Sequence, residues 1–147
     1  APGEFHTPHV ITLGSDGLLY ISDRENDRIQ VFDQMGRVQT VWPGLHGVDG
    51  LYEAPDGLLY GSTGVDHAII RLDRAGRVLD SWVEPSLLRY PHGIAIGQDG
   101  AIYIADSGDL WEIDPRTAQL PRREYLLVSR QGAEGSALTK LVVVDKT

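Results

Sequence analysis

Apolar and polar residues alternate along this chain in short runs that predict β-strands. The first runs are HVITLG, LLYISD, RIQVFD and RVQTVW, separated by Ser-Asp-Gly, by a polar loop and by QMG. They are rich in Val, Ile, Leu, Tyr and Trp and are bounded by turn-forming residues, as is typical of strands. No stretch repeats apolar residues at the 3.6-residue period of an amphipathic helix. The chain therefore predicts short strands joined by turns, with almost no helix.

The same strand pattern occurs three times, at a period near 40 residues. Each copy has an Asp-Gly pair between two apolar runs, which predicts a hairpin because the tight turn needs the positive φ that Gly adopts easily. The matched positions are the Asp-Gly pairs at 16–17, 56–57 and 99–100, the tyrosines Tyr20, Tyr60 and Tyr103, the aspartates Asp33, Asp73 and Asp114, and the tryptophans Trp42 and Trp82. Four strands per repeat at this period are typical of β-propeller blades. Leucine-rich repeats are shorter and alternate a strand with a helix, and a β-sandwich would not match turns and tyrosines in three copies.

The predicted architecture is one all-β domain, with three four-stranded blades within residues 1–129. The blades span about 8–42, 48–83 and 91–129, and YLLVS at 125–129 is the predicted outer strand of the third. Residues 130–147 are predicted to form a linker and a terminal strand, LTKLVVVD, which belongs to a neighbouring blade or to a second chain. Propellers usually close with four to eight blades, and an open array leaves strand edges exposed. We therefore predict that two chains close a six-bladed homodimer; a fragment of a longer propeller is the alternative.

Composition excludes several classes of function. The 147 residues include 13 basic and 21 acidic side chains, a net charge of −8, and no cysteine. Scattered basic residues in an acidic chain argue against nucleic-acid binding, because phosphate neutralisation supplies most of that affinity. No apolar run approaches the roughly 20 residues that span a bilayer. The N-terminal residues lack a signal-peptide pattern, and the compartment stays undetermined.

One position near the start of each repeat carries a residue suited to metal binding. His9, Asp49 and His92 each lie seven residues before the Asp of their Asp-Gly turn, at the predicted rim of the central channel. Imidazole and carboxylate groups suit zinc and related divalent ions. Ligands from separate blades would converge across the channel and leave coordination positions open, as in a catalytic site. The alternative is that these side chains are polar because the channel contains water.

Two further residues are candidates for substrate contact. Tyr90 precedes Pro91-His92 and is predicted to flank the channel mouth, and His46 lies near the same rim. The loop DRENDR at 23–28 is predicted to be solvated and internally paired. Within this loop Asp23, like its equivalent Asp106, is predicted to cap backbone amides.

Two segments resemble NHL repeats: PHVITLGSDGLLYISDRENDRIQVFDQMGRV and PHGIAIGQDGAIYIADSGDLWEID. PGEFHTPH followed by YISDRENDRIQVFD is also similar to bacterial NHL proteins related to peptidyl-α-hydroxyglycine α-amidating lyase. The resemblance implies a six-bladed propeller with zinc held by histidines of Pro-His motifs, calcium in the channel, and cleavage of peptidyl-α-hydroxyglycine to a peptide amide and glyoxylate. It implies that His9 and His92 match two of three zinc histidines. The third histidine and the family's catalytic arginine and tyrosines belong to an earlier part of the family's sequence.

Two functional hypotheses remain open at this point. The first is a zinc-dependent lyase or hydrolase acting on a small polar or peptide ligand, with His9 and His92 as metal ligands and Asp49 as a ligand or general base. Calcium is the second ion to consider. The other hypothesis is a non-catalytic NHL scaffold that presents its rim to a peptide or protein partner, since one fold serves many functions.

Overall fold

The computed structural model describes residues 1–83, 85–86, 88–98, 101–106 and 125–130, and this part of the chain is almost entirely β-structure. Its helical structure is one 3₁₀ turn, η1 (Arg24–Asn26). The prediction of an all-β chain is confirmed. The described residues contain no helix with the length and apolar character that a membrane crossing needs.

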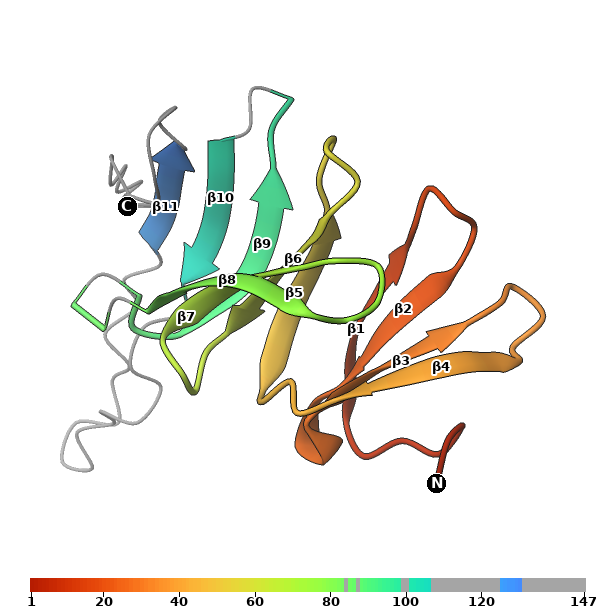
Figure 1. Ribbon diagram of the computed structural model, residues 1–147. Coiled ribbons are helices and arrows are strands. Elements are labelled where there is room, and N and C mark those ends of the chain that lie inside the picture. The colour runs from red at the N-terminus through yellow and green to blue at the C-terminus, as the bar shows by residue number, and fades with distance from the viewer. Residues whose placement is uncertain (84, 87, 99–100, 107–124, 131–147) are drawn as a thin grey trace, which may run out of the picture.

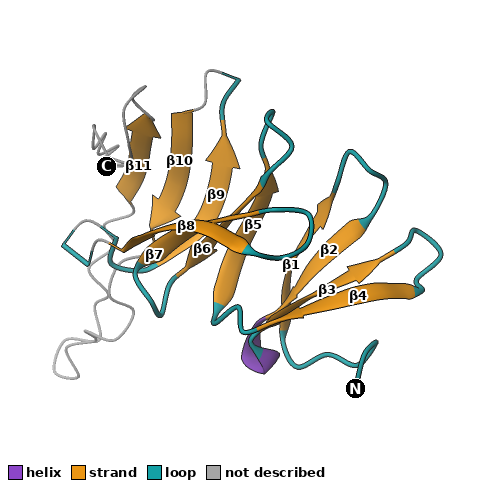
Figure 2. Cartoon of the chain, in the orientation of Figure 1, coloured by secondary structure: helices purple, strands orange, loops and turns teal. Residues whose placement is uncertain are grey.

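Three antiparallel sheets follow one another along the chain (Figures 1 and 2). The first sheet contains β1 (Pro8–Leu13), β2 (Leu19–Asp23), β3 (Arg28–Phe32) and β4 (Val38–Pro43). The second contains β5 (Val48–Glu53), β6 (Leu59–Thr63), β7 (Ala68–Leu72) and β8 (Val78–Val83). The third contains β9 (Pro91–Ile96), β10 (Ala101–Asp106) and β11 (Tyr125–Arg130). The first two sheets keep the strands in chain order, as expected for propeller blades, and the inner strands β1, β5 and β9 lie beside one another.

Turn chemistry explains why the first two repeats fold alike. Gly17 and Gly57 both adopt φ of +80°, which a side chain would strain. The preceding carboxylates, Asp16 and Asp56, accept hydrogen bonds from the backbone N–H two residues later, at 3.0 and 2.9 Å. The predicted Asp-Gly hairpins are therefore confirmed in these repeats. Asp99-Gly100 and Asp114 lie outside the described residues.

An apolar core fills each space between neighbouring sheets. The cluster between the first two sheets contains Tyr20, Ile29, Val31, Trp42, Leu45, Val48, Leu51, Leu59, Ile70 and Leu72. The cluster between the second and third contains Ala54, Tyr60, Ile69, Leu88, Ile96, Ile102 and Ile104. The repeated aromatic positions meet inside these cores: Tyr20 lies 5.2 Å from Trp42, and Tyr60 lies 6.4 Å from Trp82, between ring centroids. Equivalent residues of the first two repeats therefore make equivalent packing contacts between sheets.

Equivalent serines tie each sheet to the next. Ser22 Oγ donates to the carbonyl of Val48, and Ser62 Oγ donates to the carbonyl of His92, both at 2.6 Å. Both acceptors lie at the start of an inner strand. Because Ser22 and Ser62 are buried, these bonds fix where β5 and β9 begin relative to the preceding sheet.

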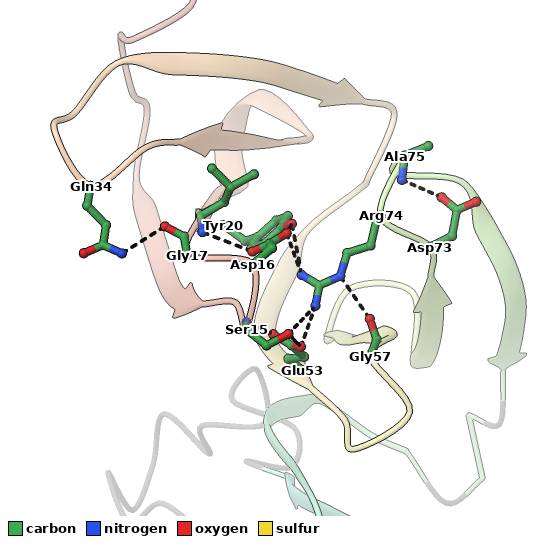
Figure 3. Close-up of polar contacts among 11 residues, drawn as sticks. Ser15, Asp16, Gly17, Tyr20, Gln34, Glu53, Gly57, Asp73, Arg74 and Ala75 are labelled. Atoms are coloured by element: carbon green, nitrogen blue, oxygen red, sulfur yellow. Dashed lines mark hydrogen bonds and ion pairs between the residues drawn. The ribbon is translucent and has the colours of Figure 1, made fainter.

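A cluster around Arg74 joins the first two sheets at the opposite ends of the inner strands (Figure 3). The guanidinium donates to Asp16 Oδ2 at 3.2 Å, to the Tyr20 hydroxyl at 3.0 Å and to the Gly57 carbonyl at 3.0 Å, and it forms an ion pair with Glu53. Its central carbon lies 5.4 Å from the centroid of the Tyr20 ring. One arginine thus neutralises two carboxylates from different sheets.

The third sheet differs from the sequence prediction in one strand. β11 pairs directly with β10, the place that β3 and β7 hold in their own sheets, whereas YLLVS was predicted to be the outermost of four strands. This pairing satisfies the backbone groups along the second edge of β10. The predicted terminal strand LTKLVVVD lies outside the described residues.

Candidate metal site at the inner rim

The structure brings His9, Asp49 and His92 together. Each is the second residue of an inner strand, in β1, β5 and β9 respectively. One ligand atom from each lies within 4.8 Å of the others. The shared register that the sequence indicated therefore corresponds to a shared place in space.

A register irregularity at the start of each inner strand presents these side chains. The pairing between β1 and β2 shifts between Pro8 and Ile11, and that between β5 and β6 shifts between Val48 and Gly50, around Asp49. In β9, the register passes from Pro91 to Gly93, so that His92 is the extra residue. β-bulges re-aim side chains and are frequent beside functional sites. The sequence analysis did not predict them, because residue spacing does not show where a ladder is interrupted.

His9 is oriented by the backbone of its neighbour. Its Nδ1 lies 2.8 Å from the carbonyl oxygen of Asp49. A carbonyl only accepts hydrogen bonds, so Nδ1 carries the proton and, in the neutral ring, Nε2 keeps a free lone pair. Nε2 lies 3.9 Å from Asp49 Oδ1. Metal-ligating histidines commonly donate their second N–H to a carbonyl in this way.

His92 lies between His9 and Tyr90. Its ring centroid is 4.8 Å from that of His9, in an edge-on arrangement, and 6.3 Å from that of Tyr90. Burial lowers the pKa of His92 below its usual value; the charge of Asp49 opposes this, while His9 and Arg24 lower the pKa further. The neutral imidazole, which is the form that binds metal ions, is therefore favoured at neutral pH.

The carboxylate of Asp49 is buried and already has two partners. The Gly64 N–H donates to Oδ2 at 3.0 Å, and Arg24 Nη1 donates to Oδ1 at 3.0 Å. Sequence reasoning missed Arg24, having placed it in an internally paired loop. The loop does contain ion pairs between Asp23 and Arg28 and between Arg24 and Glu25. The sequence did offer one signal for Arg24, because this residue directly follows a strand that ends at the same rim.

Tyr90 lies beside His92, and its surroundings are tight. A Cβ atom added to Gly64 would come within 2.6 Å of the Tyr90 ring and within 2.7 Å of Asp49 Oδ2. Burial raises the pKa of the Tyr90 hydroxyl, and the charge of Asp49 raises it further while Arg24 opposes this. The phenol is therefore protonated at neutral pH and can donate a hydrogen bond.

The predicted amide caps are confirmed, and one of them holds the rim. Asp23 Oδ1 accepts from the backbone N–H of His6 at 2.6 Å. Its equivalent Asp106 accepts from the backbone N–H groups of Arg89 and Tyr90, at 2.8 and 3.0 Å. Asp106 thus positions the backbone that leads into Pro91-His92.

His46 has its contacts elsewhere. Its Nδ1 lies 3.0 Å from Asp66 Oδ1, and its Nε2 lies 3.9 Å from Asp27 Oδ1. The hydrogen bond with Asp66 raises the pKa of His46 against a small opposing effect of burial, and the charges of Asp66 and Asp27 add to the rise. The structure therefore groups His46 with two exposed aspartates and not with His9, Asp49 and His92.

The comparisons with known proteins agree with the fold. Residues 5–32 and 88–111 match the NHL repeat family, and these segments include both rim histidines. The chain therefore contains NHL repeats, and its sheets have the β-propeller fold. Two solved structures show the same fold. A gluconolactonase of Xanthomonas campestris has a TM-score of 0.71 and 18% identity, over 97% of this chain and 49% of that chain. A virginiamycin B lyase of Staphylococcus aureus has a TM-score of 0.61 and 23% identity, over 68% of this chain and 34% of that chain.

The sequence is also similar to an amidating enzyme. The propeller is 32% identical to peptidyl-glycine alpha-amidating monooxygenase B of Xenopus laevis, in an alignment that covers 98% of this chain and 18% of the relative. The chain thus spans about a fifth of the length of that relative.

Proposed function

We propose that this NHL propeller binds a divalent metal ion through His9, His92 and Asp49, and that the site serves a lyase reaction on a peptidyl-α-hydroxyglycine or a similar small polar ligand. The observation that carries the proposal is the convergence of three ligand atoms from three strands within 4.8 Å. The similarity to an amidating enzyme over almost the whole chain supports the choice of reaction.

The donor set favours zinc. Two imidazoles and one carboxylate are common zinc ligands, whereas calcium takes six to eight oxygen atoms, which makes calcium the weaker candidate here. Tetrahedral zinc with bonds of about 2.0–2.2 Å places its ligand atoms roughly 3.4 Å apart. The 3.9 Å between His9 Nε2 and Asp49 Oδ1 is close to that value. Movements of about 1 Å would complete the set, within the range of side-chain rotation.

Each residue has a defined role in this proposal. The Asp49 carbonyl holds His9 so that Nε2 faces the site, and burial keeps His92 neutral. A bound zinc ion would supply Lewis-acid polarisation of a substrate oxygen. Cleavage of an α-hydroxyglycine requires that the hydroxyl lose a proton, that the carbon–nitrogen bond break and that the amide nitrogen gain a proton. Asp49 acts as a metal ligand in this proposal, and the Tyr90 hydroxyl would orient the substrate.

The non-catalytic scaffold also has a specific observation in its favour. Arg24 already neutralises Asp49, so the rim can persist without a metal ion and bind a peptide directly. The two functions predict opposite responses to chelation, because a scaffold keeps its peptide or protein partner in EDTA.

Metal analysis of the purified chain tests the proposal. We expect zinc near stoichiometric levels after expression with added zinc, and loss of that zinc in the double variant His9→Ala, His92→Ala. His46→Ala is the matched control, because its imidazole bonds to aspartates outside the candidate set. Glyoxylate release from a peptidyl-α-hydroxyglycine by the zinc-loaded chain would support the lyase reaction. Zinc far below stoichiometric levels in the wild-type chain would overturn the metal site.

A further inference from the structure

Arg24 and the candidate metal position depend on the same oxygen atom. Asp49 Oδ1 accepts from Arg24 Nη1 at 3.0 Å and lies 3.9 Å from His9 Nε2. The other carboxylate oxygen, Oδ2, accepts from the buried N–H of Gly64. Rotating the carboxylate to free Oδ2 would leave that N–H without its bond, which is costly in a buried position. A cation bound by the two histidines therefore competes with Arg24 for Oδ1.

Arg24 also has a second carboxylate available. Its Nε donates to Glu25 Oε1 at 2.9 Å, and its Nη2 lies 2.8 Å from the same oxygen. Glu25 precedes Asn26 in the turn η1 and is more exposed than Asp49. The guanidinium can thus release Asp49 and remain paired, so its displacement does not strand an unpaired charge.

We propose that Arg24 is an internal competitor of the metal ion, which occupies Asp49 when the metal is absent and shifts to Glu25 when the metal binds. This inference rests on the proposed metal site and adds its regulation. A positive charge next to the ligand set weakens the binding of a divalent cation, because charges a few ångströms apart interact strongly where solvent is partly excluded. Arg24 thereby sets the metal concentration at which the site fills.

Zinc titration by calorimetry tests the competition, with the visible absorption of Co²⁺ as a second readout of ligand geometry. Arg24→Gln removes the charge and keeps a hydrogen-bond donor, and we expect zinc affinity to rise by about tenfold or more. Arg24→Lys keeps the charge and should stay within about threefold of wild type. Arg37→Gln is the control for net charge, because Arg37 is exposed and pairs with Asp33 in the turn between β3 and β4. It should bind zinc as the wild type does.

A double-mutant cycle separates competition for Asp49 from a general charge effect. In the Asp49→Asn background, the gain from Arg24→Gln should fall below about threefold. Equal gains in both backgrounds, or equal zinc affinity in wild type and Arg24→Gln, would overturn the competition while leaving the metal site intact. No zinc binding by either protein would overturn the metal site and the competition with it.

Discussion

Replacing Arg74 by methionine removes the charge that links the first two sheets while keeping an apolar stem over Tyr20. The side chain is 31% exposed and its ion-pair partner Glu53 is 13% exposed. Exposed ion pairs contribute about 0–1 kcal/mol, and breaking a buried pair costs about 3–5 kcal/mol. Because the Arg74–Glu53 pair is partly exposed, its contribution should lie between these two values. We therefore expect Arg74→Met to lower the free energy of unfolding by about 2–3 kcal/mol, a fall of roughly 5–10 °C in Tm.

The loss of stability caused by Arg74→Met should depend on pH in a defined direction. Burial raises the pKa of Glu53, but hydrogen bonds from Ser15 and the charge of Arg74 outweigh it, and the net pKa is lowered. The pKa of Asp16 is also lowered, because bonds from Tyr20 and Leu18 and the charge of Arg74 outweigh burial. A lowered pKa stabilises the fold above the unfolded-state value, and that stability is lost as pH falls through the folded value. The difference between wild type and Arg74→Met should narrow below about pH 4.

Urea unfolding followed by circular dichroism, with thermal melts at several pH values, measures both effects. Arg77→Met is the matched control, because Arg77 lies in the same turn, is 78% exposed and pairs only with Asp73 among the described residues. It should cost less than about 1 kcal/mol. If the two variants unfold within about 0.5 kcal/mol of each other at neutral pH, the cluster does not hold the sheets together as argued.

Three further predictions concern the rim, its neighbouring loops and the open face of the first sheet. Gly64→Ala should destabilise the fold by about 1–3 kcal/mol in urea unfolding and weaken zinc binding, because the new Cβ meets Tyr90 and Asp49; unchanged values would contradict the tight packing. His46 has a raised pKa, so its stabilisation is present below about pH 6.5 and is lost as pH rises through the folded value. The difference in the free energy of unfolding between wild type and His46→Gln should therefore be larger near pH 5.5 than near pH 8. A difference that does not change with pH would refute this stabilisation by His46. Ile11 is 59% exposed whereas its equivalent Leu51 is 4% exposed against the preceding sheet, so light scattering should show a dimer that Ile11→Asp dissociates; a wild-type monomer would contradict closure by two chains.

Most of the fold could be predicted from the sequence repeat. Asp16 and Asp56 precede glycines in matching turns, and Tyr20 and Tyr60 pack in matching cores. The same residues at the same repeat positions form the same turns and the same packing. The pairing of β10 with β11 could not be predicted in the same way. The residues of β11 lie more than 18 positions from β10 in the sequence. A single sequence does not show which of several distant strands pairs with a given strand edge.

The candidate site was predictable as far as register determines position. His9, Asp49 and His92 converge because they occupy one place in three copies of the unit. Arg24 escaped prediction because its equivalent in the second repeat is Gly64, so the repeat gives no signal for it, and its contact with Asp49 crosses between sheets. The contacts of His46 could not be predicted, because nearness to Asp49 in sequence does not reveal two aspartates from neighbouring loops.

X-ray absorption spectroscopy of the zinc-loaded chain tests the metal site most directly. The account predicts zinc with two imidazole ligands and at least one oxygen ligand at about 2.0–2.2 Å, and loss of the bound zinc together with its imidazole scattering in the double variant His9→Ala, His92→Ala. Zinc surrounded by oxygen alone, or an unchanged spectrum in the double variant, would contradict it.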